Sequence, residues 1–170
     1  MPAPRKASPA KSQSAEGLFA GYSKTEKPLG GYAALMGLFT VVLSSAVTSF
    51  SAEEDPPRLT LGDLLLLGIA THKLSRIVTK DLVTSPFRAP FVKFKKSAGA
   101  GEVEEDARGE GLQEAVGDLI TCPYCIAPWL ATTLVFAHSR APRATRMICA
   151  IFSVTAASDF LNQLYVRAKE

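Results

Sequence analysis

Two cysteines two residues apart, Cys122 and Cys125, are the residues of this chain best suited to chemistry. Their sequence, Cys-Pro-Tyr-Cys, has a spacing that serves both thiol–disulfide exchange and zinc binding. At a helix N-terminus, the dipole and the free N–H groups would stabilise a reactive thiolate. Redox proteins with this motif place it in a βαβ unit, and no such pattern surrounds the pair. Redox exchange is therefore an alternative function and not the leading one.

Zinc is a second alternative, because a structural zinc site needs four ligands and the pair supplies two. The other soft ligand candidates are His72, His138 and Cys149. Two such pairs meeting at a dimer axis would also complete the set. The structural interpretation is favoured: the thiols pack in a reducing compartment, the prolines shape the helix entry, and Trp129 packs or anchors. We predict no catalytic residue and no cofactor, with zinc at Cys122 and Cys125 as the alternative.

The element that would position the pair is a long apolar segment. No charged side chain lies between Leu119 and Ala137, which is about the length of a membrane-crossing helix. Three further apolar blocks occupy residues 28–52, 59–78 and 147–166. The block 59–78 is weaker because it carries charges; Thr60 is predicted to cap its helix, with Asp63 near the N-terminus. The chain is therefore predicted to be an all-α integral membrane bundle of about four hydrophobic helices. A soluble helical bundle is the alternative fold.

The basic residues favour one orientation of such a bundle. In a bundle of four spans, 15 of the 19 Lys and Arg residues fall on the side of the two termini and the middle loop. The other side has four: Arg58, Arg140, Arg143 and Arg146. The positive-inside rule then places both termini and the middle loop in the cytoplasm of a multi-pass cell-membrane protein. Residues 1–28 have the composition of a disordered basic tail. We divide the chain into this tail and a membrane helical domain, 29–170, with a cytoplasmic loop at 73–116.

The cytoplasmic loop combines aromatic and basic residues. Phe87, Phe91 and Phe94 alternate with Arg88, Lys93, Lys95 and Lys96. This pattern predicts an interfacial segment attracted to anionic lipid headgroups. Nucleic acid is not an expected partner, because the net charge of +3 is small. Residues 97–111 are small, acidic and rich in glycine, which predicts a flexible loop.

Two segments, 71–91 and 109–131, together resemble a family of small bacterial membrane proteins of unknown function, which includes a Bacillus sporulation-associated protein. The family pattern in the first segment is matched by Lys73, Leu74, Ser75, Arg76, Asp81, Thr84, Ser85, Pro86, Arg88, Pro90 and Phe91. In the second it is matched by Gly117, Asp118, Leu119, Cys122, Pro123, Cys125 and Trp129. The resemblance implies a bacterial membrane protein and implies no reaction.

Our leading functional prediction is a non-enzymatic membrane interaction or assembly component, as a homo-oligomer or with a protein partner. The alternative is a cytoplasm-facing thiol-redox or metal-binding protein that acts through Cys122 and Cys125. The candidate structural and interaction residues are Lys73, Arg76, Asp81, Arg88, Asp118 and Trp129. We predict that Arg76 or Arg88 pairs with Asp118 or Asp81 and closes the loop over the cysteines, because a bidentate arginine–carboxylate pair fixes geometry well.

Overall fold

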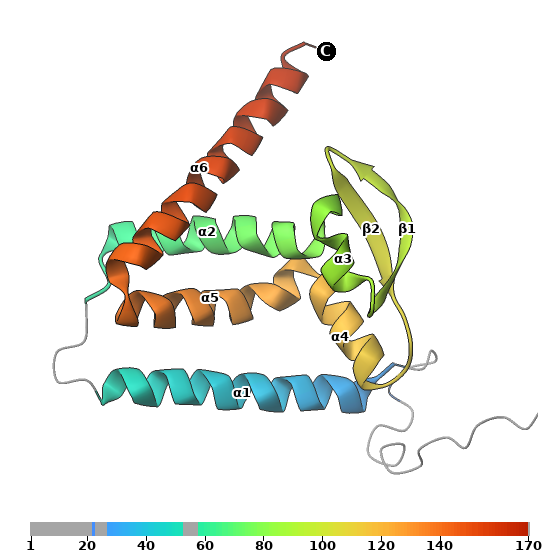
Figure 1. The fold of residues 1–170 in the computed structure, drawn as a ribbon, viewed down its shortest axis with the longest axis horizontal. Helices are drawn as coiled ribbons and strands as arrows, with labels where there is room; N and C mark the ends of the chain where they lie inside the picture. The colour runs from blue at the N-terminus through green and yellow to red at the C-terminus, as the bar shows by residue number, and fades with distance from the viewer. Residues whose placement is uncertain (1–21, 23–26, 53–57, 170) are drawn as a thin grey trace, which may run out of the picture.

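The computed structural model describes Tyr22, residues 27–52 and residues 58–169 (Figure 1). Its long helices are α1 (Leu29–Ser51), α2 (Leu61–Thr79), α5 (Pro123–Arg140) and α6 (Pro142–Arg167). Its shorter elements are the 3-10 helix η1 (Leu82–Thr84), α3 (Ser85–Arg88), β1 (Val92–Gly99), β2 (Glu102–Ala107) and α4 (Leu112–Thr121). Most of the predicted tail, 1–28, lies outside the described residues.

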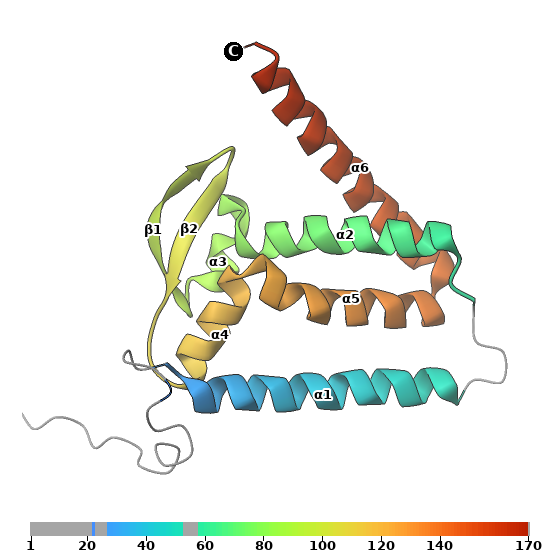
Figure 2. The same cartoon turned by 180° about the vertical axis from the view of Figure 1, so that it is seen from behind.

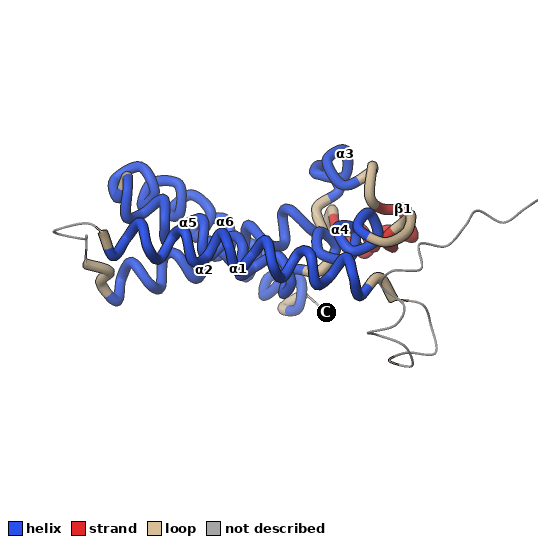
Figure 3. Tube along the Cα trace, turned by 90° about the horizontal axis from the view of Figure 1, so that it is seen from below, coloured by secondary structure: helices blue, strands red, loops and turns tan. Residues whose placement is uncertain are grey.

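Helices α1, α2 and α5 run back and forth along one direction, and α6 runs obliquely to them (Figures 1 and 2). Helices α1, α5 and α2 lie side by side, and α6 starts beside α2 and then diverges from it (Figures 1 and 2). The hairpin of β1 and β2 gathers with α3 and α4 at the end where α1 begins. Seen from below, the long helices form a shallow layer with this group at one end (Figure 3). The molecule therefore has a helical body and, at one end, a head formed by the hairpin, α3 and α4.

The core of the body lies where α2, α5 and α6 meet. Leu67 and Ala70 of α2, Leu134 of α5 and Cys149 of α6 are buried together. Helix α2 begins with the predicted cap: the Asp63 N–H donates to Thr60 Oγ1 (3.2 Å), and the Asp63 carboxylate accepts from the Thr60 N–H (3.1 Å). Such a capping box satisfies two backbone donors that the helix cannot satisfy by itself.

Residues 92–107 correct two predictions, the all-α fold and the flexible loop at 97–111. They form an antiparallel β-hairpin, in which Lys93 pairs with Asp106 and Lys96 with Glu104 across the strands. The tip, Gly99–Ala100–Gly101, has positive φ at all three residues, which glycine adopts at little cost. A basic strand and an acidic strand joined by a glycine-rich turn attract each other across the sheet. The protein is therefore mostly helical, with a small two-stranded sheet.

The membrane-span count of four is not confirmed by helix length and apolarity. Among the described residues, α1 and α6 are long and apolar enough to cross a membrane. Helices α4 and α5 add a third candidate if the pair counts as one span, although it bends by 84° at the break between them. Helix α2 does not qualify as a span. It contains Lys73 and Arg76 and continues to Thr79, so the first part of the predicted loop 73–116 is helical.

Candidate functional site

The cysteine pair lies at the elbow between α4 and α5. Cys122 is the N-cap residue of α5, and its Sγ accepts the backbone N–H of Cys125 at 3.2 Å. The two sulfurs are joined in a disulfide, so the expectation of two separate packed thiols is not what the structure shows. Cys125 is exposed, and Tyr124 beside it is 88% exposed. The elbow therefore presents Cys125 at the surface, and Cys122 is half-buried.

The structure gives the zinc alternative no further ligands. No group of three or more His, Cys, Asp or Glu side chains suited to a metal occurs in the part of the chain that the structure describes. Cys149 is buried in the core between α2, α5 and α6, and His138 lies near the far end of α5. The described residues therefore supply no complete zinc site around Cys122 and Cys125.

Asp118 lies on α4, one turn before the elbow, and it binds α1. The Tyr32 hydroxyl donates a hydrogen bond to Asp118 Oδ2. At the same place α1 approaches α4 so closely that a Cβ on Gly31 would lie 2.7 Å from Ala115 Cβ. Further along, the rings of Phe39 and Trp129 meet with centroids 5.0 Å apart. Asp118 and Trp129 therefore hold α1 against α4 and α5.

Arg88 is buried under the hairpin and makes a dense set of hydrogen bonds. Its side chain is 2% exposed, and its Nε lies 2.5 Å from Glu105 Oε2, whose side chain is 4% exposed. It also donates to the carbonyls of Val78 and Asp81 and to the hydroxyls of Thr84 and Ser85. All three guanidinium nitrogens are satisfied, so Arg88 fixes β2 to the segment after α2 and offers no charge to a ligand.

Arg76 makes the second link to the hairpin. Its Nη2 lies 2.5 and 2.6 Å from the two carboxylate oxygens of Glu102. The prediction that Arg76 or Arg88 pairs with Asp118 or with the Asp81 carboxylate is therefore wrong. The acidic partners come from β2, because the hairpin folds this strand back beside the end of α2. Asp81 contributes its backbone instead, through a bridge to Glu102.

Lys73 lies inside α2 and pairs with α6. Its Nζ is 2.7 Å from Asp159 Oδ2, and its side chain is 13% exposed against 52% for Asp159. The pair lies between α2 and α6, which diverge in this direction (Figure 1). Charged groups inside apolar helices usually pair in this way with a neighbouring helix.

A second ionic cluster, which the sequence analysis missed, joins the helix ends opposite the hairpin. Arg146 of α6 donates to both carboxylate oxygens of Asp63, at 2.7 and 3.0 Å. His138 of α5 places Nε2 3.4 Å from Asp63 Oδ1. Asp63 is the one acid inside the apolar block 59–78, and that isolation was the available signal for a buried partner.

The basic residues of the hairpin do not form an unopposed positive surface. Lys95 Nζ lies 3.1 Å from Asp106 Oδ1, and Lys96 Nζ lies 3.4 Å from Glu104 Oε2. Strand β2 has two further carboxylates, those of Glu102 and Glu105. The attraction of this segment to anionic lipid headgroups stays a prediction, and the acidic strand would weaken it.

The region of the chain that matches known proteins contains all of the head and most of the body. Residues 66–165 match the model of a family described as protein of unknown function (DUF1360). The chain is also 24% identical over 104 residues to "Sporulation protein YjcA" of Bacillus subtilis (strain 168), which covers 59% of this chain and 88% of the relative. No solved structure matches the chain. Because the matched region is more than half of the chain, this protein belongs to that family of proteins of unknown function, DUF1360.

Proposed function

We propose that this protein is a multi-pass membrane protein that acts as a non-enzymatic interaction or assembly component. In this proposal α1, α2, α5 and α6 cross the bilayer, and the hairpin, α3, α4 and both chain ends lie on the cytoplasmic side. The proposal concerns a scaffold that presents a rigid head at the membrane surface.

The exposed apolar surface of the long helices carries this proposal. On α1, Met36 is 71% exposed and Val41 63%; on α6, Val154 is 70% and Phe160 66%. These side chains are distributed along each helix and do not form one small patch. A water-exposed surface of this size is unfavourable for a soluble protein, whereas lipid would cover it.

The positions of the polar groups also support a crossing of the bilayer. The ion pairs of Arg76 and Arg88 are at the hairpin end, and the pair of Asp63 and Arg146 is at the opposite end. A bilayer-crossing bundle places such groups at its two surfaces. Helix α2 is the exception, and its Lys73 is paired with Asp159 of α6. A helix with charged groups can cross a bilayer when neighbouring helices cover them.

The head supplies a surface for a partner. Large apolar side chains are exposed on the elements gathered at this end: Leu82, Val83, Phe87, Phe94 and Tyr124. Val83, Phe87 and Tyr124 are each at least 80% exposed. Because Arg88 anchors α3 and β2 beneath them, these side chains are presented on a fixed backbone, which lowers the ordering cost of binding.

Topology is tested with two single cysteines in a variant in which all three native cysteines are serine. Ser97→Cys lies in the exposed end of β1, and Arg143→Cys lies at the exposed start of α6. In intact cells, a membrane-impermeant maleimide should label Arg143→Cys and should label Ser97→Cys only after lysis. Labelling of both or of neither before lysis would contradict the crossing, as would release of the protein by alkaline carbonate.

Thiol–disulfide exchange at Cys122 and Cys125 is the second candidate function. The observation that favours it is an exposed disulfide at the N-terminus of an 18-residue helix. The two functions predict different results when the cysteines are replaced by serine. A scaffold keeps its membrane level and its partners in the Cys122→Ser/Cys125→Ser variant, whereas an exchange protein loses its function with either substitution.

A further inference from the structure

The segment formed by η1 and α3, residues 82–88, has the reverse of the side-chain distribution expected in water. Its one charged side chain, that of Arg88, is 2% exposed, whereas Phe87 is 82% exposed and Val83 80%. Charged side chains are normally exposed, and large apolar side chains are normally buried. Arg88 donates to the carbonyl oxygens of Val78 and Asp81, and these contacts hold the segment in place. The segment therefore keeps its charge inside and presents apolar side chains to its surroundings.

The segment lies where α2 would leave the bilayer in the proposed crossing. It follows the end of α2 at Thr79, and Figure 3 shows α3 standing out from one side of the layer of long helices. Tyr124, which is 88% exposed, lies in the first turn of α5, and α5 begins at the same end of the layer (Figure 1). Val83, Phe87 and Tyr124 are therefore found beside the ends of two long helices.

The apolar surface continues from α2 onto α3. Val78 of α2, Phe87 of α3 and Ile120 of α4 line a hollow of about 290 Å³ together with Thr84 and Arg88. Val78 and Ile120 are half-buried, so part of each side chain remains open to the surroundings. Lipid around α2 would therefore reach Phe87 along a continuous apolar surface.

A lipid–water interface favours the residue types found here. Aromatic side chains are enriched at both surfaces of a membrane, where the ring contacts apolar lipid and a group such as the Tyr124 hydroxyl reaches headgroups or water. The neighbouring charge of Arg88 is already paired with Glu105, so it does not select an anionic lipid or an acidic protein. The exposed apolar side chains thus favour the interface of the bilayer whatever the headgroup charge.

We infer that residues 82–88 and the first turn of α5 insert Val83, Phe87 and Tyr124 into the cytoplasmic lipid–water interface. The inference rests on the proposed membrane crossing, and it names the bilayer as the partner of this surface. Because Arg88 joins α3 to Glu105 of β2, the insertion also fixes the depth of the hairpin relative to the membrane.

The test uses tryptophan fluorescence of the full chain in phosphatidylcholine vesicles, whose lack of net charge excludes attraction of the basic strand to anionic headgroups. The background is Trp129→Phe, which removes the one native tryptophan and keeps a ring opposite Phe39. Phe87→Trp should lose roughly half of its emission when the lipid chains are brominated near the headgroup, and less when they are brominated near the chain end.

Phe94→Trp is the matched control, because it is the same substitution at an exposed site on β1, the strand on the outer side of the hairpin (Figures 1 and 2). It should keep its emission with both brominated lipids. If Phe94→Trp is quenched as strongly as Phe87→Trp, the assignment of the interface to residues 82–88 is overturned. Tyr124→Trp is a second reporter if Phe87→Trp does not fold, and the same quenching is expected of it.

Val154→Trp, at a site 70% exposed on α6, tests the crossing separately. It should be quenched more strongly by bromine near the chain end than by bromine near the headgroup. If Val154→Trp behaves in this way while Phe87→Trp is quenched by iodide in the water and not by lipid, the inference is overturned and the crossing stands. If Val154→Trp is not quenched by either lipid, the proposed crossing itself is overturned.

Discussion

Arg88 and Glu105 form an ion pair that is buried from solvent, with side chains 2% and 4% exposed. Lys95 and Asp106 form a pair on the same hairpin with side chains 54% and 63% exposed. The two differ in consequence, because removing one member of a buried pair leaves an uncompensated charge in a low-dielectric environment. Exposed pairs contribute little in comparison. The position of the hairpin therefore depends on Arg88 far more than on the surface lysines.

Arg88→Met should destabilise the protein by about 3–5 kcal/mol, because Glu105 is left buried without a partner. Arg88→Met/Glu105→Met should recover part of this loss, since both charges are then gone. Thermal unfolding in detergent, followed by circular dichroism, measures the effect. Lys95→Met is the matched control, with a change of less than about 0.5 kcal/mol. Equal losses for the buried and the exposed variant would contradict the role given to Arg88.

Gly117 is required by a close approach between α4 and the hairpin. A Cβ there would lie 2.5 Å from the Phe91 carbonyl oxygen and 2.8 Å from Ala107 Cβ. Gly117→Ala should therefore destabilise by about 1–3 kcal/mol, as overpacking does. Gly68→Ala in α2 is the control, because its Cβ meets no described atom within 4 Å, and it should stabilise by up to about 1 kcal/mol. Thermal unfolding in detergent measures both changes in stability. Equal effects of the two variants would contradict this close packing of α4 on the hairpin.

At the scale of the elements, the local sequence explains the break between α4 and α5. Pro123 follows the N-cap Cys122, and the two helices meet at 84°. Proline fits the first turn of a helix and cannot continue a preceding one, so the break falls where the sequence predicts a helix entry. The disulfide then closes the first turn of α5.

The disulfide predicts a thiol count. Protein purified under alkylating conditions and then denatured without reductant should show one free thiol, Cys149, and three after reduction. Titration with Ellman's reagent measures this. Three thiols before reduction would mean that the cell keeps Cys122 and Cys125 reduced, as expected of a cytosolic face. The Cys149→Ser variant is the control, and it should lower both counts by one.

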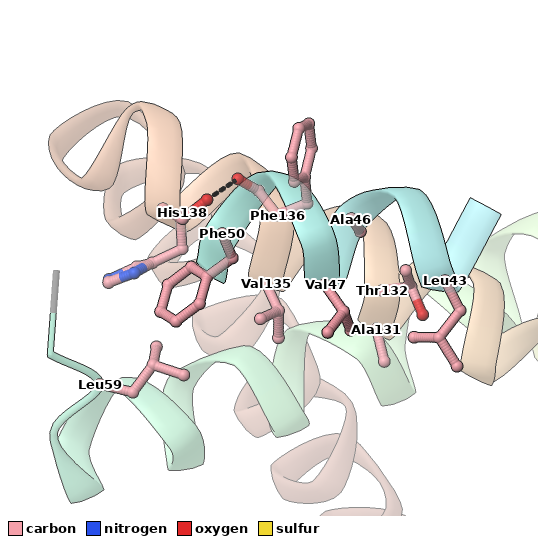
Figure 4. Close-up of a pocket in the computed structure, with 11 residues that line it drawn as sticks. Leu43, Ala46, Val47, Phe50, Leu59, Ala131, Thr132, Val135, Phe136 and His138 are labelled. Carbon is pink, nitrogen blue, oxygen red and sulfur yellow. Dashed lines mark hydrogen bonds between the residues drawn. The ribbon is translucent and has the colours of Figure 1, made fainter. Parts of the chain in front are cut away.

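At the scale of the whole molecule, α1 is attached at one end. Its first half contacts α4 and α5 through Gly31, Tyr32 and Phe39, whereas its second half borders an apolar groove between α1 and α5 (Figure 4). The core cluster of α2, α5 and α6 contains no residue of α1, and the family match begins at residue 66. Helix α1 therefore lies outside the matched region and packs on α4 and α5, on either side of the elbow.

This attachment predicts that two separately expressed fragments, 1–58 and 59–170, should associate in the membrane. Gly31→Leu should reduce co-purification of the two fragments several-fold, because its side chain would collide with Ala115 and the Gly111 carbonyl. Gly37→Leu is the matched control, since the site is open to 4 Å, and it should have no effect. Fragments that co-purify equally with both substitutions would contradict this attachment.

The elements and the sites differ in how far the sequence predicted them. The apolar blocks gave the long helices, and Thr60 and Asp63 gave the start of α2, because these signals depend on near neighbours in the chain. The hairpin was missed because its acidic strand, 102–107, was assigned to a flexible loop on composition. That error also misassigned the partners of Arg76 and Arg88, because a flexible loop would not hold the acids of β2 in fixed positions beside the two arginines.

The family was indicated by the resemblance of two segments. The amino-acid sequence by itself also determined the apolar helices, their polar ends and the helix entry at the cysteine pair. These follow from composition and short-range spacing, which fix local structure. Only the tertiary structure decided that Glu102 and Glu105 receive the two arginines, that Asp63 receives Arg146, and that α1 leaves a groove beside α5. Those features arise where helix ends and strands distant in the chain come together, and spacing along the sequence carries no information about such distances.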